Sequence, residues 1–232
     1  MPQNNPICVA LDTPDIAKAK ALARAVKPHV GMMKIGMEFF YANGAAGYGA
    51  VASEGIPIFL DLKLHDIPNT VSQGLTSLLK LSPAPAIINI HATGGTDMMK
   101  AAKDAVGDNV KLIAVTILTS LSEIDIHKIA FDPALDSKLL ATHLSILAHG
   151  AKLDGVVCSP HDVARIREIL PREFLTVVPG IRPADTDAHD QKRVATPKAA
   201  VEAGADILVI GRAITGAADP AKAAADILAS LK

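Results

Sequence analysis

The chain has 232 residues, of which half are apolar and one in five is charged, and its formal net charge is −1. This composition indicates neither a disordered tail nor a nucleic-acid-binding surface, and it favours a small molecule as the partner. Because no apolar run approaches ~18 residues and residues 1–6 lack the pattern of an export signal, we expect a soluble, cytoplasmic protein that binds no membrane.

Short runs of branched apolar residues recur along the whole chain, with room for a helix after each. The predicted strands are residues 7–12, 31–36, 56–63, 86–92, 111–118, 155–159, 175–181 and 207–212. Helix-like patterns cover residues 15–26, 72–81, 97–105, 122–129, 137–148, 161–170 and 197–203. Apolar strands that alternate with helices predict a parallel sheet, and eight such units predict one (β/α)₈ TIM barrel domain over residues 1–232. An open, doubly wound sheet is the alternative fold.

Residues that often hold metals give no pattern here. The eight His residues form no His-x-His or His-Glu-x-x-His spacing, so no metal site is expected. Cys8 and Cys158 each lie in a predicted strand, and no Cys-x-x-Cys spacing exists. We therefore expect two reduced, buried thiols.

A dense polar stretch follows the third predicted strand and runs Asp61-Leu62-Lys63-Leu64-His65-Asp66-Ile67-Pro68-Asn69-Thr70. Because strand side chains alternate between faces, Asp61 and Lys63 leave the strand on one face. An isolated Asp-x-Lys pair is usually a surface ion pair of little energetic value. Asp66 and Thr70 extend the pair into a cluster, at the position where α/β folds place their chemistry.

Polar residues also stand at the carboxyl end of every other predicted strand. They are Asp12, Lys34, His91, Thr116 with Thr119, Ser159, Arg182, and Gly211 with Arg212. In a barrel these ends meet on one face, so the pattern predicts a single site. His91 and the nearby His65 are expected to support or pack against that site and not to act as general bases.

The loops after the last two predicted strands indicate that the ligand carries a phosphate. Barrels commonly bind phosphate there, through backbone N–H groups and a helix N-terminus. Arg182 and Arg212 offer planar forks to phosphate oxygens, and Gln191 adds a neutral donor. Gly211 lets a ligand approach the backbone, although the alternative is that it only tightens a turn beside a solvated Arg. Residues 182–195 are expected to form a mobile loop that closes over phosphate.

Several segments together make the sequence resemble the orotidine 5'-phosphate decarboxylase family, of the bacterial type. They are Ala10-Leu11-Asp12, Lys34-Ile35-Gly36, the stretch from Asp61 to Thr70, Asn89-Ile90-His91-Ala92, Leu118-Thr119-Ser120, Pro179-Gly180-Ile181-Arg182-Pro183 and Gly211-Arg212. The resemblance covers essentially the full length, and its Asp-x-Lys-x-x-Asp element with Pro-Asn-Thr is highly specific. The chain departs from it at Ala213, where relatives commonly have Pro, and in the acidic stretch 185–189.

The resemblance implies decarboxylation of orotidine 5'-phosphate to uridine 5'-phosphate in pyrimidine biosynthesis, without metal or cofactor, by a homodimer. It implies an alternating charge network of Lys34, Asp61, Lys63 and Asp66. Asp66 and Thr70 would come from the partner subunit. Loss of CO₂ leaves a carbanion at C6, and Lys63 is the natural donor of the proton that follows. The implied substrate contacts are Asp12 and Lys34 to the ribose, Thr119 near the base, and Arg182, Gln191, Gly211 and Arg212 to the phosphate.

Two other functions fit parts of the pattern. Mg²⁺-dependent sugar-phosphate decarboxylases and aldolases of the same superfamily share the Asp-x-Lys-x-x-Asp element. They have a metal-binding Glu where this chain has Lys34, and a Lys there would repel Mg²⁺. A non-catalytic phosphate-binding barrel would keep Arg212 but has no need for the charged cluster around Asp61.

Overall fold

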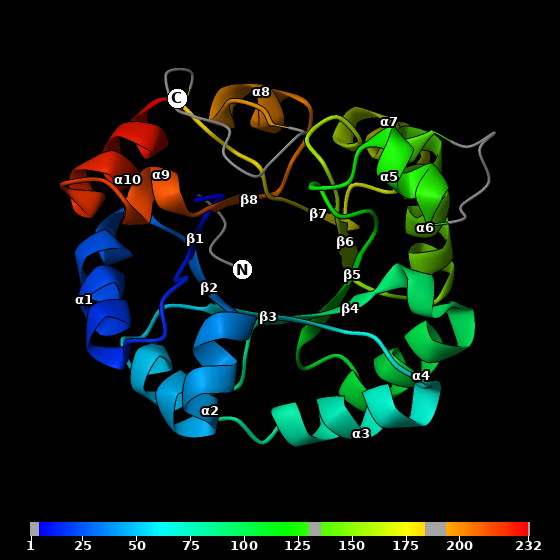
Figure 1. The fold of residues 1–232 in the computed structure, drawn as a ribbon, viewed down its shortest axis with the longest axis horizontal. Helices are drawn as coiled ribbons and strands as arrows, with labels where there is room; N and C mark the ends of the chain where they lie inside the picture. The colour runs from blue at the N-terminus through cyan, green and yellow to red at the C-terminus, as the bar shows by residue number, and fades with distance from the viewer. Residues whose placement is uncertain (1–4, 130–135, 184–193, 232) are drawn as a thin grey trace.

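The computed structural model describes residues 5–129, 136–183 and 194–231. Within these residues, parallel strands pair in chain order and the last pairs with the first, so they form a closed barrel with helices around it (Figure 1). The strands are β1 (Ile7–Ala10), β2 (Met32–Gly36), β3 (Ile58–Leu64), β4 (Ile87–His91), β5 (Lys111–Val115), β6 (Gly155–Val157), β7 (Leu175–Val178) and β8 (Ile207–Ile210). The predicted (β/α)₈ barrel is confirmed.

The helices form the outer ring, in which α10 packs beside α1 (Figure 1). They are α1 (Ile16–Val26), α2 (Met37–Ala52), α3 (Pro68–Leu78), α4 (Thr96–Val106), α5 (Glu123–Lys128), α6 (Ser137–Gly150), α7 (Val163–Ile169), α8 (Pro197–Glu202), α9 (Arg212–Thr215) and α10 (Pro220–Ala229), with 3₁₀ helices η1 (Lys27–His29) and η2 (Ala92–Gly94). Among the described residues, no helix has both the length and the apolar character needed to cross a membrane.

Short polar side chains determine where several helices begin. Asp15, Asp136 and Asp219 precede α1, α6 and α10, and each accepts the backbone N–H three residues on, at 3.0, 2.7 and 2.9 Å. Such a cap satisfies a backbone donor that has no partner inside the helix, and it is typically worth about 1 kcal/mol.

Two apolar layers lie on the two sides of the barrel wall. Alternate strand residues pack together inside the barrel, and this interior cluster consists of Cys8, Ala10, Met32, Phe59, Ile87, Ile113, Val177, Ile207 and Val209. Residues at the intervening positions, such as Val9, Ile35 and Leu60, pack in the second layer with the helices. Cys158 is buried like Cys8, and the two cysteines do not form a disulfide, in agreement with the prediction of reduced, buried thiols. This interior cluster fills the barrel next to the polar side chains at the carboxyl ends of the strands.

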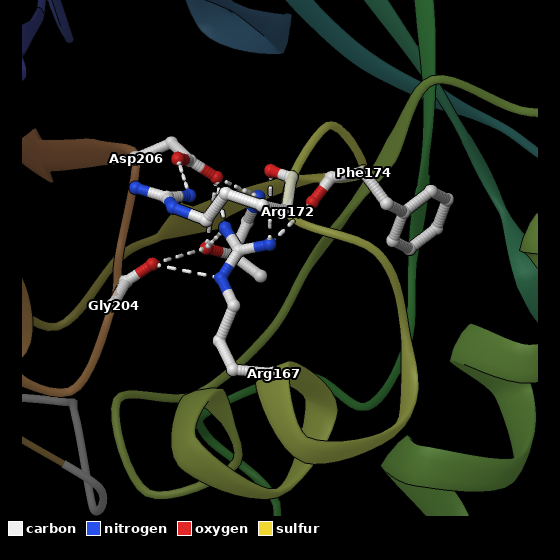
Figure 2. Close-up of polar contacts among 6 residues, drawn as sticks. Arg167, Arg172, Phe174, Gly204 and Asp206 are labelled. Atoms are coloured by element: carbon white, nitrogen blue, oxygen red, sulfur yellow. Dashed lines mark hydrogen bonds and ion pairs between the residues drawn. The ribbon is translucent and has the colours of Figure 1, made fainter.

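A polar cluster joins α7 to β7 and β8 at the amino-terminal end of these strands (Figure 2). Asp206 lies directly before β8 and accepts hydrogen bonds from the backbone N–H of Thr176, at 2.7 Å, and from the guanidinium groups of Arg167 and Arg172. Arg167 also donates to two nearby backbone carbonyl oxygens, at 2.9 and 2.7 Å. The cluster therefore stabilises the end of the barrel opposite to the carboxyl ends of the strands.

Some element boundaries differ from those predicted. Strands β1, β5 and β7 end at Ala10, Val115 and Val178, earlier than expected. Leu11 and Thr116 each still donate one backbone hydrogen bond to the neighbouring strand, at 3.0 and 3.1 Å. Helix α3 begins at Pro68 and not at residue 72, since Pro fits the first helical turn, where its missing N–H is not needed. Helix α2 was not singled out, because three glycines weaken its intrinsic helical preference.

Candidate active site

A cavity of about 500 Å³ opens at the carboxyl end of the barrel. The predicted site residues that line it are Asp12, Lys34, Asp61, Lys63, Thr119, Arg182, Gly211 and Arg212. They lie within β2, β3 and α9 or in the segments that follow β1, β5, β7 and β8. Side chains from distant parts of the sequence thus meet in one cavity.

Four of these side chains form a row of alternating charges. The Nζ of Lys34 lies 3.3 Å from Oδ1 of Asp12 and 3.2 Å from Oδ2 of Asp61. The other oxygen of Asp61, Oδ1, lies 2.6 Å from Nζ of Lys63. Lys34 and Asp61, the inner members, each contact two opposite charges, and their side chains are only 11% and 10% exposed.

The surroundings of Lys34 and Asp61, the two inner members of this row, favour the charged form of each. Burial by itself raises the pKa of Asp61, but Lys34 and Lys63 outweigh it, and the pKa lies below its ordinary value. Burial by itself lowers the pKa of Lys34, but Asp61 and Asp12 outweigh it, and the pKa lies above its ordinary value. Both groups therefore stay ionised around neutral pH.

Lys63 has an unusual backbone conformation. Its φ of 53° lies in the left-handed region, which typically costs a residue other than Gly about 1–3 kcal/mol. The backbone N–H of Lys63 donates to Oδ1 of Asn89 at 2.8 Å, and this contact supports the strained turn. We did not predict Asn89 as a site residue, because one Asn within an apolar strand does not reveal what its side chain contacts.

His91 lies beside the charge row, and its ring centroid is 5.3 Å from that of His65. Burial, with smaller contributions from His65 and Lys63, lowers the pKa of His91 to about 4. Its imidazole is therefore neutral at pH 7 and adds no positive charge to the cavity.

Asp66 and Thr70 do not line the cavity of this subunit. Both residues are exposed, and Oδ1 of Asp66 accepts the backbone N–H of Ile67 at 2.7 Å. Within the described part of the chain, no ion pair joins Asp66 to Lys63. Their predicted place in a partner's site stays a prediction.

The predicted phosphate residues lie where the cavity meets the ends of β7 and β8. Gly211 precedes the short helix α9, and Arg212 is the first residue of that helix. A Cβ at position 211 would lie 3.7 Å from Oδ2 of Asp12, which is an ordinary van der Waals contact, so a side chain there would adjoin the charge row. Arg182 is buried and donates to the carbonyl of the residue before it at 2.8 Å. Gln191 and the centre of the predicted phosphate loop lie outside the described residues.

Comparisons with known proteins agree with this geometry. The family model described as "Orotidine 5'-phosphate decarboxylase / HUMPS family" matches residues 5–227. The orotidine 5'-phosphate decarboxylases of Erythrobacter litoralis and Novosphingobium aromaticivorans are 48% and 50% identical to this chain, over 98% of it and 100% of each relative. The crystal structure of orotidine 5'-phosphate decarboxylase from Lactobacillus acidophilus superposes with a TM-score of 0.84, at 37% identity, over 98% of this chain and 99% of the other.

The closed barrel, with a charged cavity at the carboxyl ends of its strands, defines the protein as an enzyme of the TIM-barrel class. More narrowly, the chain belongs to the orotidine 5'-phosphate decarboxylase / HUMPS family. The resemblance seen in the sequence is thereby confirmed.

Proposed function

We propose that this enzyme converts orotidine 5'-phosphate to uridine 5'-phosphate and CO₂ without a cofactor, as a step of pyrimidine biosynthesis. The observation that carries the proposal is the row of alternating charges from Asp12 to Lys63 in the cavity. The names of the curated relatives support the same reaction.

Lys63 serves the chemical step as a cation and then as an acid. When the bond between C6 and the carboxylate breaks, its electron pair stays on C6, where no cofactor takes up the charge. An ammonium beside C6 stabilises this developing charge and then delivers its proton there. Asp61 holds that ammonium at 2.6 Å and keeps it oriented.

Asp61 also acts on the substrate, because its carboxylate would lie near the carboxylate that leaves. Two like charges ~4 Å apart, at an effective dielectric constant of ~20, repel by about 4 kcal/mol. Departure of neutral CO₂ relieves this repulsion. The larger part of the rate increase must come from stabilisation of the transition state by Lys63 and its surroundings.

The rest of the cavity binds the nucleotide. Asp12 and Lys34 contact the ribose hydroxyls, and Thr119 lies near the base. The phosphate binds to Arg182, Gln191, Gly211 and Arg212. All of these except Gln191, which lies outside the described residues, line the one cavity, and this supports the assignment.

The active form is proposed to be a homodimer in which Asp66 and Thr70 complete the partner's site. Large apolar side chains at the carboxyl end of the barrel support a second copy there. Ile67 is 65% exposed, and Tyr41 and Met37 on α2 are 71% and 44% exposed. Single exposed apolar side chains are common on monomers, whereas a contiguous patch of them is typical of a surface that another subunit covers.

The position of Lys34 separates this function from the Mg²⁺-dependent alternative. Its ammonium lies between the carboxylates of Asp12 and Asp61, where a divalent cation would meet a positive charge. We therefore expect uridine 5'-phosphate to form from orotidine 5'-phosphate at the same rate with and without excess EDTA. No product, or product only after Mg²⁺ is added, would contradict the proposal.

Replacement of Arg212 by Ala is expected to lower kcat/KM for orotidine 5'-phosphate about tenfold to a hundredfold, because a charge-assisted hydrogen bond to the phosphate is lost. Orotidine, which has no phosphate, should react equally well with both proteins. The control is Arg165→Ala, which removes an exposed Arg of α7 that pairs with Glu168 at 2.8 Å. Equal losses for both substrates would show that Arg212 supports the structure in general.

A further inference from the structure

Asn89 lies where the ladder between β3 and β4 is interrupted. Leu60 pairs with Ile88 and Leu64 pairs with Ile90, so the three residues from Asp61 to Lys63 stand opposite Asn89 alone. The extra residues bulge out of the ladder, and their backbone groups need partners from side chains. The side chain of Asn89 is fully buried in this place.

The amide of Asn89 makes two different contacts with the charge row. Its Oδ1 accepts the backbone N–H of Lys63 at 2.8 Å. Its Nδ2 donates to Oδ1 of Asp61 at 2.7 Å, the same oxygen that contacts Nζ of Lys63. One uncharged side chain thus supplies an acceptor and a donor together, which neither a carboxylate nor an apolar residue can do.

These contacts determine which lysine each carboxylate oxygen of Asp61 contacts. Because Asn89 holds Oδ1 on the side of Lys63, the other oxygen is left to face Lys34 at 3.2 Å. The contact to the backbone of Lys63 stabilises its left-handed conformation, from which the side chain returns to Asp61.

We propose that Asn89 is a positioning residue for the reaction: it holds the Asp61 carboxylate and the strained Lys63 backbone so that the Lys63 ammonium stands ready in the cavity. Asn89 itself gives and takes no proton. The inference rests on the proposed function, since it concerns the same lysine.

Replacement of Asn89 by Ala is expected to lower kcat roughly a hundredfold, because a misplaced reacting group is costly, while KM changes less than about threefold. The proposed phosphate-binding residues follow other strands, β7 and β8, so the substitution should leave them in place and affect substrate binding little. The matched control is Asp206→Asn, which disturbs the polar cluster at the amino-terminal end of β7 and β8 (Figure 2). It should lower the melting temperature and leave kcat unchanged.

The isosteric variant Asn89→Asp tests the positioning role through the pH dependence of kcat, which a merely structural role of Asn89 would not change. The new carboxyl can accept the hydrogen bond from the backbone N–H of Lys63, but only its protonated form can donate a hydrogen bond to Asp61. Burial and the Asp61 carboxylate raise the pKa of that carboxyl, and they outweigh the lowering by the Lys63 ammonium, which is already paired with Asp61. Asp61 and Lys34 stay ionised around neutral pH, and His91, with a pKa of about 4, stays neutral. Comparison with the unmodified enzyme at each pH cancels the pH dependence of every group that the two proteins share. We expect kcat relative to the unmodified enzyme to rise as the pH falls from about 8 to about 6.

The outcomes of these experiments distinguish a failure of the proposed reaction from a failure of the positioning role of Asn89. If the unmodified enzyme forms no uridine 5'-phosphate, the proposed function fails, whatever Asn89 does. If that enzyme is active and Asn89→Ala keeps its kcat within about threefold, the inference alone is overturned. A relative kcat of Asn89→Asp that does not vary with pH would also overturn it, and this test is available even if the Ala variant does not fold.

Discussion

Replacing Lys63 with Ala is expected to lower kcat about a thousandfold or more. The substitution removes the proposed proton donor and the positive charge nearest to C6, and each effect alone is typically worth a hundredfold or more. The barrel should survive, because Asp61 keeps its contacts with Lys34 and Asn89. The measurement is kcat for orotidine 5'-phosphate, together with the melting temperature of both proteins.

The matched control for this variant is Lys111→Ala. Lys111 also lies in a strand and pairs with an aspartate, Asp154, at 2.8 Å, but at the amino-terminal end of β5. Its loss should leave kcat unchanged. If Lys63→Ala kept more than about a tenth of the kcat, a barrier increase below ~1.4 kcal/mol, Lys63 would not have the role proposed here.

Mixing two inactive proteins, Lys63→Ala and Asp66→Ala, is expected to restore about a quarter of the original activity. If Asp66 serves the partner's site, one site of each mixed dimer carries both lesions and the other carries none. Random exchange makes half of the dimers mixed, and each of these has one good site out of two. The measurement is activity after subunit exchange, with the exchange itself followed by native mass spectrometry.

A second mixture serves as the control for this experiment. Asp61 and Lys63 contact each other within one subunit, so a mixed dimer of Asp61→Ala and Lys63→Ala has one lesion in every site. This mixture should stay inactive. The shared-site model fails if exchange is complete and the mixture with Asp66→Ala also recovers no activity.

The sequence alone was sufficient to predict the barrel and eight of the residues that line the cavity at its carboxyl end. Eight apolar runs with helices between them leave few arrangements open, because apolar strands must be covered on both faces. The alternation of side chains along a strand predicted that Asp61 and Lys63 share one face, and they do meet, although through a bulged and left-handed backbone at Lys63. Local residue chemistry carries this information, so no knowledge of distant contacts is needed for it.

Only the tertiary structure revealed how the charge row is held. The contacts of Asn89 depend on the register between β3 and β4, and the left-handed backbone of Lys63 depends on the bulge which that register creates. The order Asp12, Lys34, Asp61, Lys63 likewise comes from strands that are adjacent in the barrel. Register is set by the packing of the whole barrel, because each strand pair is weak alone and closure aligns all of them together.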